Sequence, residues 1–330
     1  MVAARLEHAL RGHESHTGLN HYLIHAVDAS ASAARAVAAA DRLGALAPAS
    51  PHLLHMPSHI YVKVGRFDDA VRVNQQALAA ETALTATLAR QDVHPVWNWD
   101  RHNLHFLWFS ALMQDQGELA LSTARRVAGL AAGGKSPMAE YRRTLPLLTL
   151  ARLGRWDELL HEPLPAGELG VARGLGSGLQ GLALVQAGQL APAREKAALL
   201  HASLDAVRAS AARATEEDAA PRHMLETLDG WLQAELDMHD GRTDAARQAL
   251  DAAAKAEDQA GGEPPLLGAG SRIALGRVLL RAGLWADAEA AFRDDLRLHP
   301  GNAFGLRGLA EAEAARRHAA LAAKDRRRPA

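Results

Sequence analysis

Apolar residues recur along most of the chain at intervals of three and four, which places them on one face of a helix. No segment sustains the alternation of apolar and polar residues that a half-buried strand requires. Alanine and leucine, both strong helix formers, dominate these periodic segments. The pattern therefore predicts an all-α protein.

Glycines divide the periodic segments into pairs of helices. The clearest pair spans residues 271–302, with the small Gly276 in its first helix, a turn at Gly283 and the aromatic Phe292 in its second helix. This spacing matches the tetratricopeptide (TPR) repeat of about 34 residues, two antiparallel helices joined at a glycine turn. The same turn, in which glycine should cap the preceding helix in the left-handed conformation, recurs at Gly65, Gly117, Gly154, Gly188 and Gly241.

Repetition of this unit predicts one superhelical domain. About seven helix pairs and a C-terminal capping helix would form a right-handed TPR-like solenoid over residues 1–323. Its histidine-rich part is expected at 13–110 and its C-terminal repeats at 138–323. The basic residues 324–330 are expected to form a disordered tail.

The spacing between the glycine turns is uneven, which indicates insertions at 82–100, 202–221 and 261–265. Long insertions in a compact solenoid are more often functional than accidental. The sequence GLGSGLQG at 174–181 imitates a nucleotide-binding loop but follows no predicted strand. We therefore expect its glycines to allow close helix packing.

Composition excludes several kinds of partner and site. Lys+Arg 37 and Asp+Glu 38 almost cancel, so there is no overall basic field for nucleic acid or an anionic membrane. The chain contains no cysteine, which excludes disulfides, thiolate metal ligands and cysteine nucleophiles. It shows neither a signal-peptide core nor an apolar run of membrane-spanning length. We expect a soluble cytoplasmic protein.

Histidines supply the candidate chemistry. Each residue of a helix advances about 100°, so His21 and His25 share one face of a predicted helix. For the same reason His52, His55 and His59 share a face of the next one. Registered on the repeat, both stripes fall at first-helix positions, which line the concave groove of TPR arrays.

Three more histidines and a proline extend the predicted site. His16 lies in the entry turn before the first stripe, and His102 and His105 open the first helix of the following repeat. Pro57 lies inside the second stripe, and because it lacks a backbone N–H the helix must kink or begin there. The candidate metal ligands are His16, His21, His25, His52, His55, His59, His102 and His105.

Imidazoles on facing helices are a common way to hold Zn, Fe, Ni or Cu inside a helical scaffold. The lack of thiolates and the scarcity of nearby carboxylates favour copper, with zinc or iron as alternatives. Two sets of three histidines would suit a pair of copper ions, or one fully protein-bound metal beside one with open positions. The remaining interpretations are a proton-sensitive or substrate groove without metal, and coincidence.

Aromatic and polar residues near the stripes could form the surroundings of this cavity. The aromatic rings would shape it and limit water, and the polar side chains would orient the imidazoles. Plain packing, or helix capping by Asp28, is the alternative for these residues. They are Asn20, Tyr22, Asp28, Tyr61, Trp97, Trp99, Asn103 and Trp108.

The segments GLNHYLIHAVDAS, HLLHMPSHIYVKVGRFDDAVRVNQQALAAE and RHNLHFLW resemble the HYxIHxxEAS, HMPxHIYxRxGRYxDA and HNxHFLW blocks of a family of bacterial TPR proteins. The resemblance implies a TPR fold and the same eight histidines, but no reaction, since this family is one of unassigned activity. Members of that family have extra repeats before the first block, whereas this chain begins almost at that block. We therefore expect His16 to His25 to lie near an exposed end.

These observations together predict a copper-dependent oxidase or oxygenase that acts on a small molecule or peptide in the concave groove. The insertion at 82–100 would cover the site. A zinc or iron enzyme that uses the same histidines and a non-catalytic peptide-binding scaffold are the alternatives. A second copy of the chain or a partner protein could associate with the N-terminal end.

Overall fold

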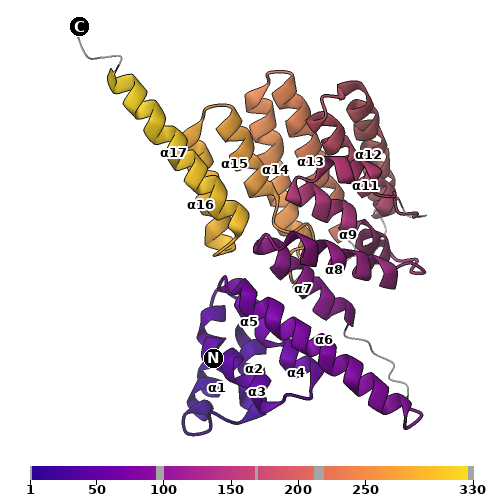
Figure 1. Cartoon of the computed structure of the whole chain (residues 1–330), viewed down its shortest axis with the longest axis vertical. Coiled ribbons are helices and arrows are strands. Elements are labelled where there is room, and N and C mark those ends of the chain that lie inside the picture. Colours follow the sequence, from indigo (N-terminus) through magenta and orange to yellow (C-terminus); the bar gives the residue numbers. More distant parts are fainter. Residues whose placement is uncertain (1, 94–99, 168–169, 212–218, 326–330) are drawn as a thin grey trace. The chain divides into compact units, whose positions relative to one another are not determined.

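The computed structural model describes residues 2–93, 100–167, 170–211 and 219–325 and contains helices but no strand within them (Figure 1). The prediction of an all-α protein is confirmed for this part of the chain. None of these helices is long and apolar enough to cross a lipid bilayer.

Some predictions fall outside the described residues. Trp97 and Trp99 are among them. So are residues 212–218 of the insertion predicted at 202–221 and residues 326–330 of the predicted tail. The first two residues of that tail, 324 and 325, are still helical.

The helices form two compact units. The first consists of Met1–Val127 with His299–Gly301, and the second of Ala128–Leu298 with Asn302–Ala330. The single solenoid over residues 1–323 stays a prediction.

The first unit contains all of the candidate histidines. Its helices are α1 (Val2–Leu10), α2 (Thr17–Val27), the 3-10 helix η1 (Ala33–Ala36), α3 (Val37–Leu46), α4 (Pro51–His55), α5 (Pro57–Lys63), α6 (Phe67–Ala89), α7 (Asp100–Met113) and most of α8 (Gly117–Leu130). Helix α6 packs against α4, α5 and α7. Fully buried Ile60, Phe67 and Trp108 belong to its core, and each such side chain contributes about 1.5–3 kcal/mol on burial.

The second unit continues with helices that pack mainly on their neighbours in the chain (Figure 1). They are α9 (Pro137–Leu153), α10 (Trp156–His161), α11 (Val171–Gln186), α12 (Leu190–Ala211), α13 (Ala220–His239), α14 (Thr243–Ala260), α15 (Ser271–Arg281), α16 (Trp285–Leu298) and α17 (Ala303–Asp325).

Most of the predicted glycine turns have the expected backbone. Their glycines have φ between 71° and 78°, a left-handed conformation that glycine adopts without strain, and each follows the end of a helix. They are Gly65, Gly154, Gly188, Gly241 and Gly283.

The prediction was wrong at Gly117, which is the first residue of α8. Helix α7 ends at Met113, and the left-handed residue that follows it is Asp115, with φ 58°. Aspartate enters this region more readily than most residues other than glycine. The turn therefore starts two residues earlier than the glycine indicated.

Small residues inside the second unit allow the close packing that the sequence predicted. A Cβ atom on Gly276 would lie 2.5 Å from the ring of Phe292, which is fully buried. A Cβ atom on Gly178, in the glycine-rich part of α11, would lie 2.6 Å from a methyl group of Leu228. These glycines therefore allow neighbouring helices to pack closely.

Pro57 divides the second histidine stripe, as expected. Helix α4 ends at His55 and α5 begins at Pro57, with Met56 between them in a helical conformation. Proline has no N–H to donate and fits the first position of a helix. The break therefore lies between His55 and His59.

Candidate metal centre

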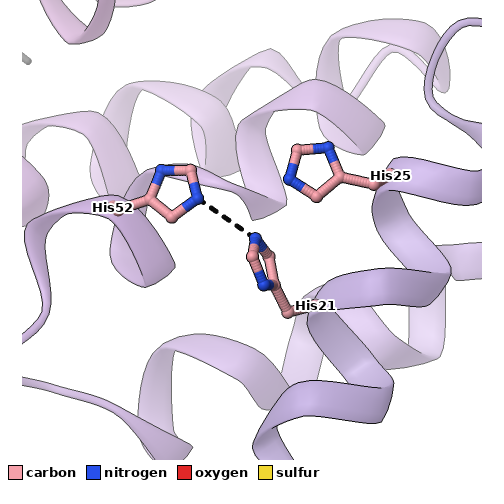
Figure 2. A group of neighbouring side chains, drawn as sticks. All are labelled: His21, His25 and His52. Atoms are coloured by element: carbon pink, nitrogen blue, oxygen red, sulfur yellow. Dashed lines mark hydrogen bonds between the residues drawn. The ribbon is translucent and has the colours of Figure 1, made fainter.

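The first of two histidine groups joins α2 to α4 (Figure 2). His21 and His25 come from successive turns of α2, and His52 comes from α4. One ring nitrogen from each residue lies within 4.8 Å of the others, and the Nε2 atoms of His21 and His52 are 3.1 Å apart. His25 is exposed and the other two are half-buried. We call this set the outer group.

The second group joins three helices. His55 comes from the end of α4, His59 from α5 and His102 from the first turn of α7. Their ring nitrogens also lie within 4.8 Å of one another. The Nε2 atom of His59 is 3.0 Å from that of His55 and 3.4 Å from that of His102. His55 and His59 are buried, so we call this set the inner group.

Both groups have dimensions that suit a metal ion. Metal–imidazole bonds of 2.0–2.1 Å at tetrahedral angles separate two ligand nitrogens by about 3.3 Å. One Nε2 separation in the outer group (3.1 Å) and two in the inner group (3.0 and 3.4 Å) lie close to that edge length. The structure thus places three imidazoles close enough to hold an ion in each group.

The two groups adjoin one another. His52 of the outer group and His55 of the inner group lie three residues apart on α4, and such residues are neighbours on a helix. The Asp28 carboxylate lies beside both groups, 3.5 Å from Nδ1 of His25 and 3.9 Å from Nδ1 of His59. A carboxylate in this position favours a metal-bound imidazole from the far side of the ring.

The electrostatic environment keeps several of these imidazoles neutral. Burial, together with the neighbouring His25 and His52, lowers the pKa of His21 to about 4. Burial also lowers the pKa of His52, with contributions from His25 and His59. The pKa of His55 falls well below its usual value, mainly through burial and then through His59 and His102. Neutral imidazole is the form that binds metal.

Two residues that the sequence did not single out hold the inner group. Asn74 of α6 is fully buried. Its Nδ2 donates a hydrogen bond to the Ala70 carbonyl (2.7 Å). Its Oδ1 therefore faces Nδ1 of His55, also at 2.7 Å. That oxygen can only accept, so His55 carries its proton on Nδ1 and leaves the Nε2 lone pair for a metal. The Phe106 ring packs against all three imidazoles, at centroid distances of 4.5–5.0 Å.

Two of the eight predicted ligands belong to neither group. His16 is exposed and caps α2, where its Nδ1 accepts a hydrogen bond from the Leu19 backbone N–H (3.2 Å). His105 stacks on Trp108, with the ring planes 6° apart. The structure therefore brings together six predicted ligands and uses His16 and His105 differently.

The predicted surrounding residues also have distinct positions. Asp28 lies beside both groups, and the exposed Tyr22 stacks on His21 with ring centroids 5.4 Å apart. Buried Tyr61 donates a hydrogen bond to Asp41 (2.9 Å), which is not a candidate ligand.

Neither predicted asparagine hydrogen-bonds to a candidate imidazole. Asn20 is fully buried and donates to the carbonyls of Glu14 and His16 while it accepts from Arg42, so it holds the turn before α2. Asn103 is equally buried, and its side chain makes no hydrogen bond among the described residues.

Comparison with known proteins assigns no family to the chain, because no family model matches it and no curated protein matches it either. The resemblance of its histidine blocks to a TPR family therefore stays a prediction.

Proposed function

We propose that the chain is a TPR-like repeat protein that binds copper at two adjoining three-histidine sites and acts as an oxidase or oxygenase. The observation that carries this proposal is the gathering of six imidazoles into two compact groups that share helix α4. Six ligands from four helices, with two groups so close together, are more than a stabilising polar cluster requires.

The ligand type favours copper. Both groups consist of imidazole alone, with no thiolate and no carboxylate among the three residues of each. Copper has the highest intrinsic affinity of the common divalent metals for such nitrogen ligands. Three protein ligands also leave a coordination position open for an exogenous molecule, which is typical of catalytic rather than structural sites.

The two groups differ in access to solvent, which gives them different expected roles. The outer group is reached from solvent through exposed His25, so a small molecule can approach it. The inner group is enclosed by Phe106 and buried His55 and His59, which exclude water and fix the imidazoles. Copper held in such sites supplies one-electron chemistry and activation of dioxygen. The residues of the chain supply binding, orientation and shielding.

Dioxygen consumption tests the catalytic part of the proposal. The protein is loaded with copper, freed of unbound metal by gel filtration, and mixed with ascorbate as reductant in an oxygen electrode. We expect dioxygen uptake per copper about tenfold faster than for copper bound to a histidine-rich peptide. A rate no greater than that of the peptide would contradict oxidase activity, and hydrolysis by the zinc-loaded protein would identify a zinc enzyme instead.

A further inference from the structure

The second unit contains a cavity that plays no part in the histidine site. It has a volume of about 170 Å³ and is lined by residues of α9, α10, α11, α13, α14 and α15. Its apolar wall includes Leu182, Leu250 and Ile273 together with the rings of Trp156 and Trp231. A space of this size admits a small organic molecule.

The charged wall of the cavity carries an excess of cations. It has three arginines, Arg152, Arg277 and Arg281, and one carboxylate, Glu235. Glu235 accepts from Arg281 at 2.7 Å through Oε1 and from Gln186 at 3.1 Å through Oε2. Both of its oxygens are engaged, and its charge balances Arg281. The guanidinium groups of Arg152 and Arg277 are the two in this wall that Glu235 does not pair with.

Arg152 is buried without a carboxylate bonded to it. The residue is 6% exposed, its Nη2 donates to the carbonyls of Gly268 (3.1 Å) and Ala269 (3.4 Å), and the guanidinium lies over the Phe304 ring. Its Nε makes no hydrogen bond within the described part of the chain. Burial lowers its pKa to about 10, so it is still charged at neutral pH.

Glu257, the carboxylate with the largest charge effect on the pKa of Arg152, accepts hydrogen bonds from the backbone. Its two oxygens accept the backbone N–H groups of Gly270 (2.8 Å) and Ser271 (2.9 Å). It therefore acts on Arg152 only through space. A buried cation with incomplete compensation is costly unless an anion joins it.

Arg277 is the second cation without a carboxylate bonded to it. Partial burial lowers its pKa, and the neighbouring Arg307 and Arg281 add to this effect against the opposing Glu311 and Glu235. No carboxylate of the described residues forms an ion pair with it within 4.0 Å. Two such guanidinium groups in one cavity form a recognition site for an anion, because the planar fork matches a carboxylate with two parallel hydrogen bonds.

From these observations we infer that the cavity binds a carboxylate that carries an apolar side chain. The cations Arg152 and Arg277 take the carboxylate, and the leucine, isoleucine and tryptophan side chains take the apolar part. The ligand is either a free small carboxylate or the C-terminal carboxylate of a peptide. The site lies wholly in the second unit and is independent of any metal at the histidines.

Calorimetric titration of the full chain with three probes tests this site. The probes are N-acetyl-L-leucine, its uncharged amide, and a short N-acetylated peptide that ends in leucine with a free carboxylate. We expect the acid to bind about tenfold tighter than the amide, since removal of the charge leaves the guanidinium groups without a partner. The stronger of the two acids identifies the source of the carboxylate.

Arginine variants locate the binding. Arg277→Met should weaken acid binding about tenfold, and Arg277→Lys, which keeps the charge but not the fork, should bind with intermediate affinity. Arg297→Met is the matched control: Arg297 is 68% exposed on α16, pairs with Asp294 and does not line the cavity, so acid binding should not change. Equal affinity for acid and amide, no binding of either acid, preferential binding of inorganic phosphate, or unchanged binding by folded Arg277→Met would each overturn the inference.

Discussion

Replacement of His21 by alanine should remove the metal ion of the outer group and leave that of the inner group. Replacement of His55 by alanine should do the reverse. Each change takes one of three imidazoles from one group and none from the other, because the two residues belong to separate sets. Loss of a direct ligand should weaken binding at that group by more than about a hundredfold, the upper range for loss of a supporting residue. Mass spectrometry of copper retained after gel filtration measures the ions that remain.

The double variant removes one imidazole from each group. His21→Ala combined with His55→Ala should retain no copper, whereas His239→Ala should retain as much as the unmodified protein, since His239 lies in the last turn of α13. Because His55 is buried, His55→Gln serves as a second variant that fills more of the same space. A folded double variant that keeps both ions would show that other residues are the ligands.

Substitution of Asn74 by leucine should weaken the inner site alone. The amide oxygen of Asn74 accepts from Nδ1 of His55 and so directs the Nε2 lone pair toward the other two imidazoles. Loss of such a supporting hydrogen bond typically costs about 10- to 100-fold in metal affinity. Competition with a copper chelator should show this loss for the inner ion and an unchanged outer ion.

Asn74→Asp is the matched control for that experiment. It keeps an oxygen acceptor at the same position, so the inner affinity should stay close to that of the unmodified protein or rise. An equal loss at both sites in Asn74→Leu would point to a general disturbance of the first unit, which thermal unfolding would reveal.

The features that the sequence predicted correctly are local. Helices, the left-handed glycine turns and the break at Pro57 follow from a few neighbouring residues, and all three are present. The exception, Gly117, arose because Asp115 can also take the left-handed conformation. Periodicity alone cannot distinguish a glycine that ends a turn from one that follows it.

The grouping of the histidines depends on contacts that periodicity does not contain. The sequence placed His52, His55 and His59 in one stripe, yet the structure divides it within α4. His52 joins the α2 histidines in the outer group, and His55, three residues later, joins His59 of α5 in the inner group. His102 joins the inner group, while His105, three residues later on α7, stacks on Trp108 instead. The packing of α7 decides whether His102 or His105 faces α5.

Asn74 and Phe106 were missed for a related reason. Asn74 lies nineteen residues from the histidine that it orients, and the contact exists only because α6 packs on α4. The one local signal was a buried asparagine inside an otherwise apolar helix face, which requires a partner. Phe106 belongs to the same sequence block as His102, one helical turn later, and could have been selected on that spacing.

The metal content of the unmodified chain shows whether the two histidine groups bind metal ions. The protein, purified without a histidine tag, is reconstituted separately with copper, zinc and iron, freed of unbound metal by gel filtration and analysed by mass spectrometry. Two groups of three imidazoles predict about two equivalents of copper per chain. Retention of fewer than ~0.2 equivalents of every metal would contradict it, because sites of this ligand number should hold an ion through filtration.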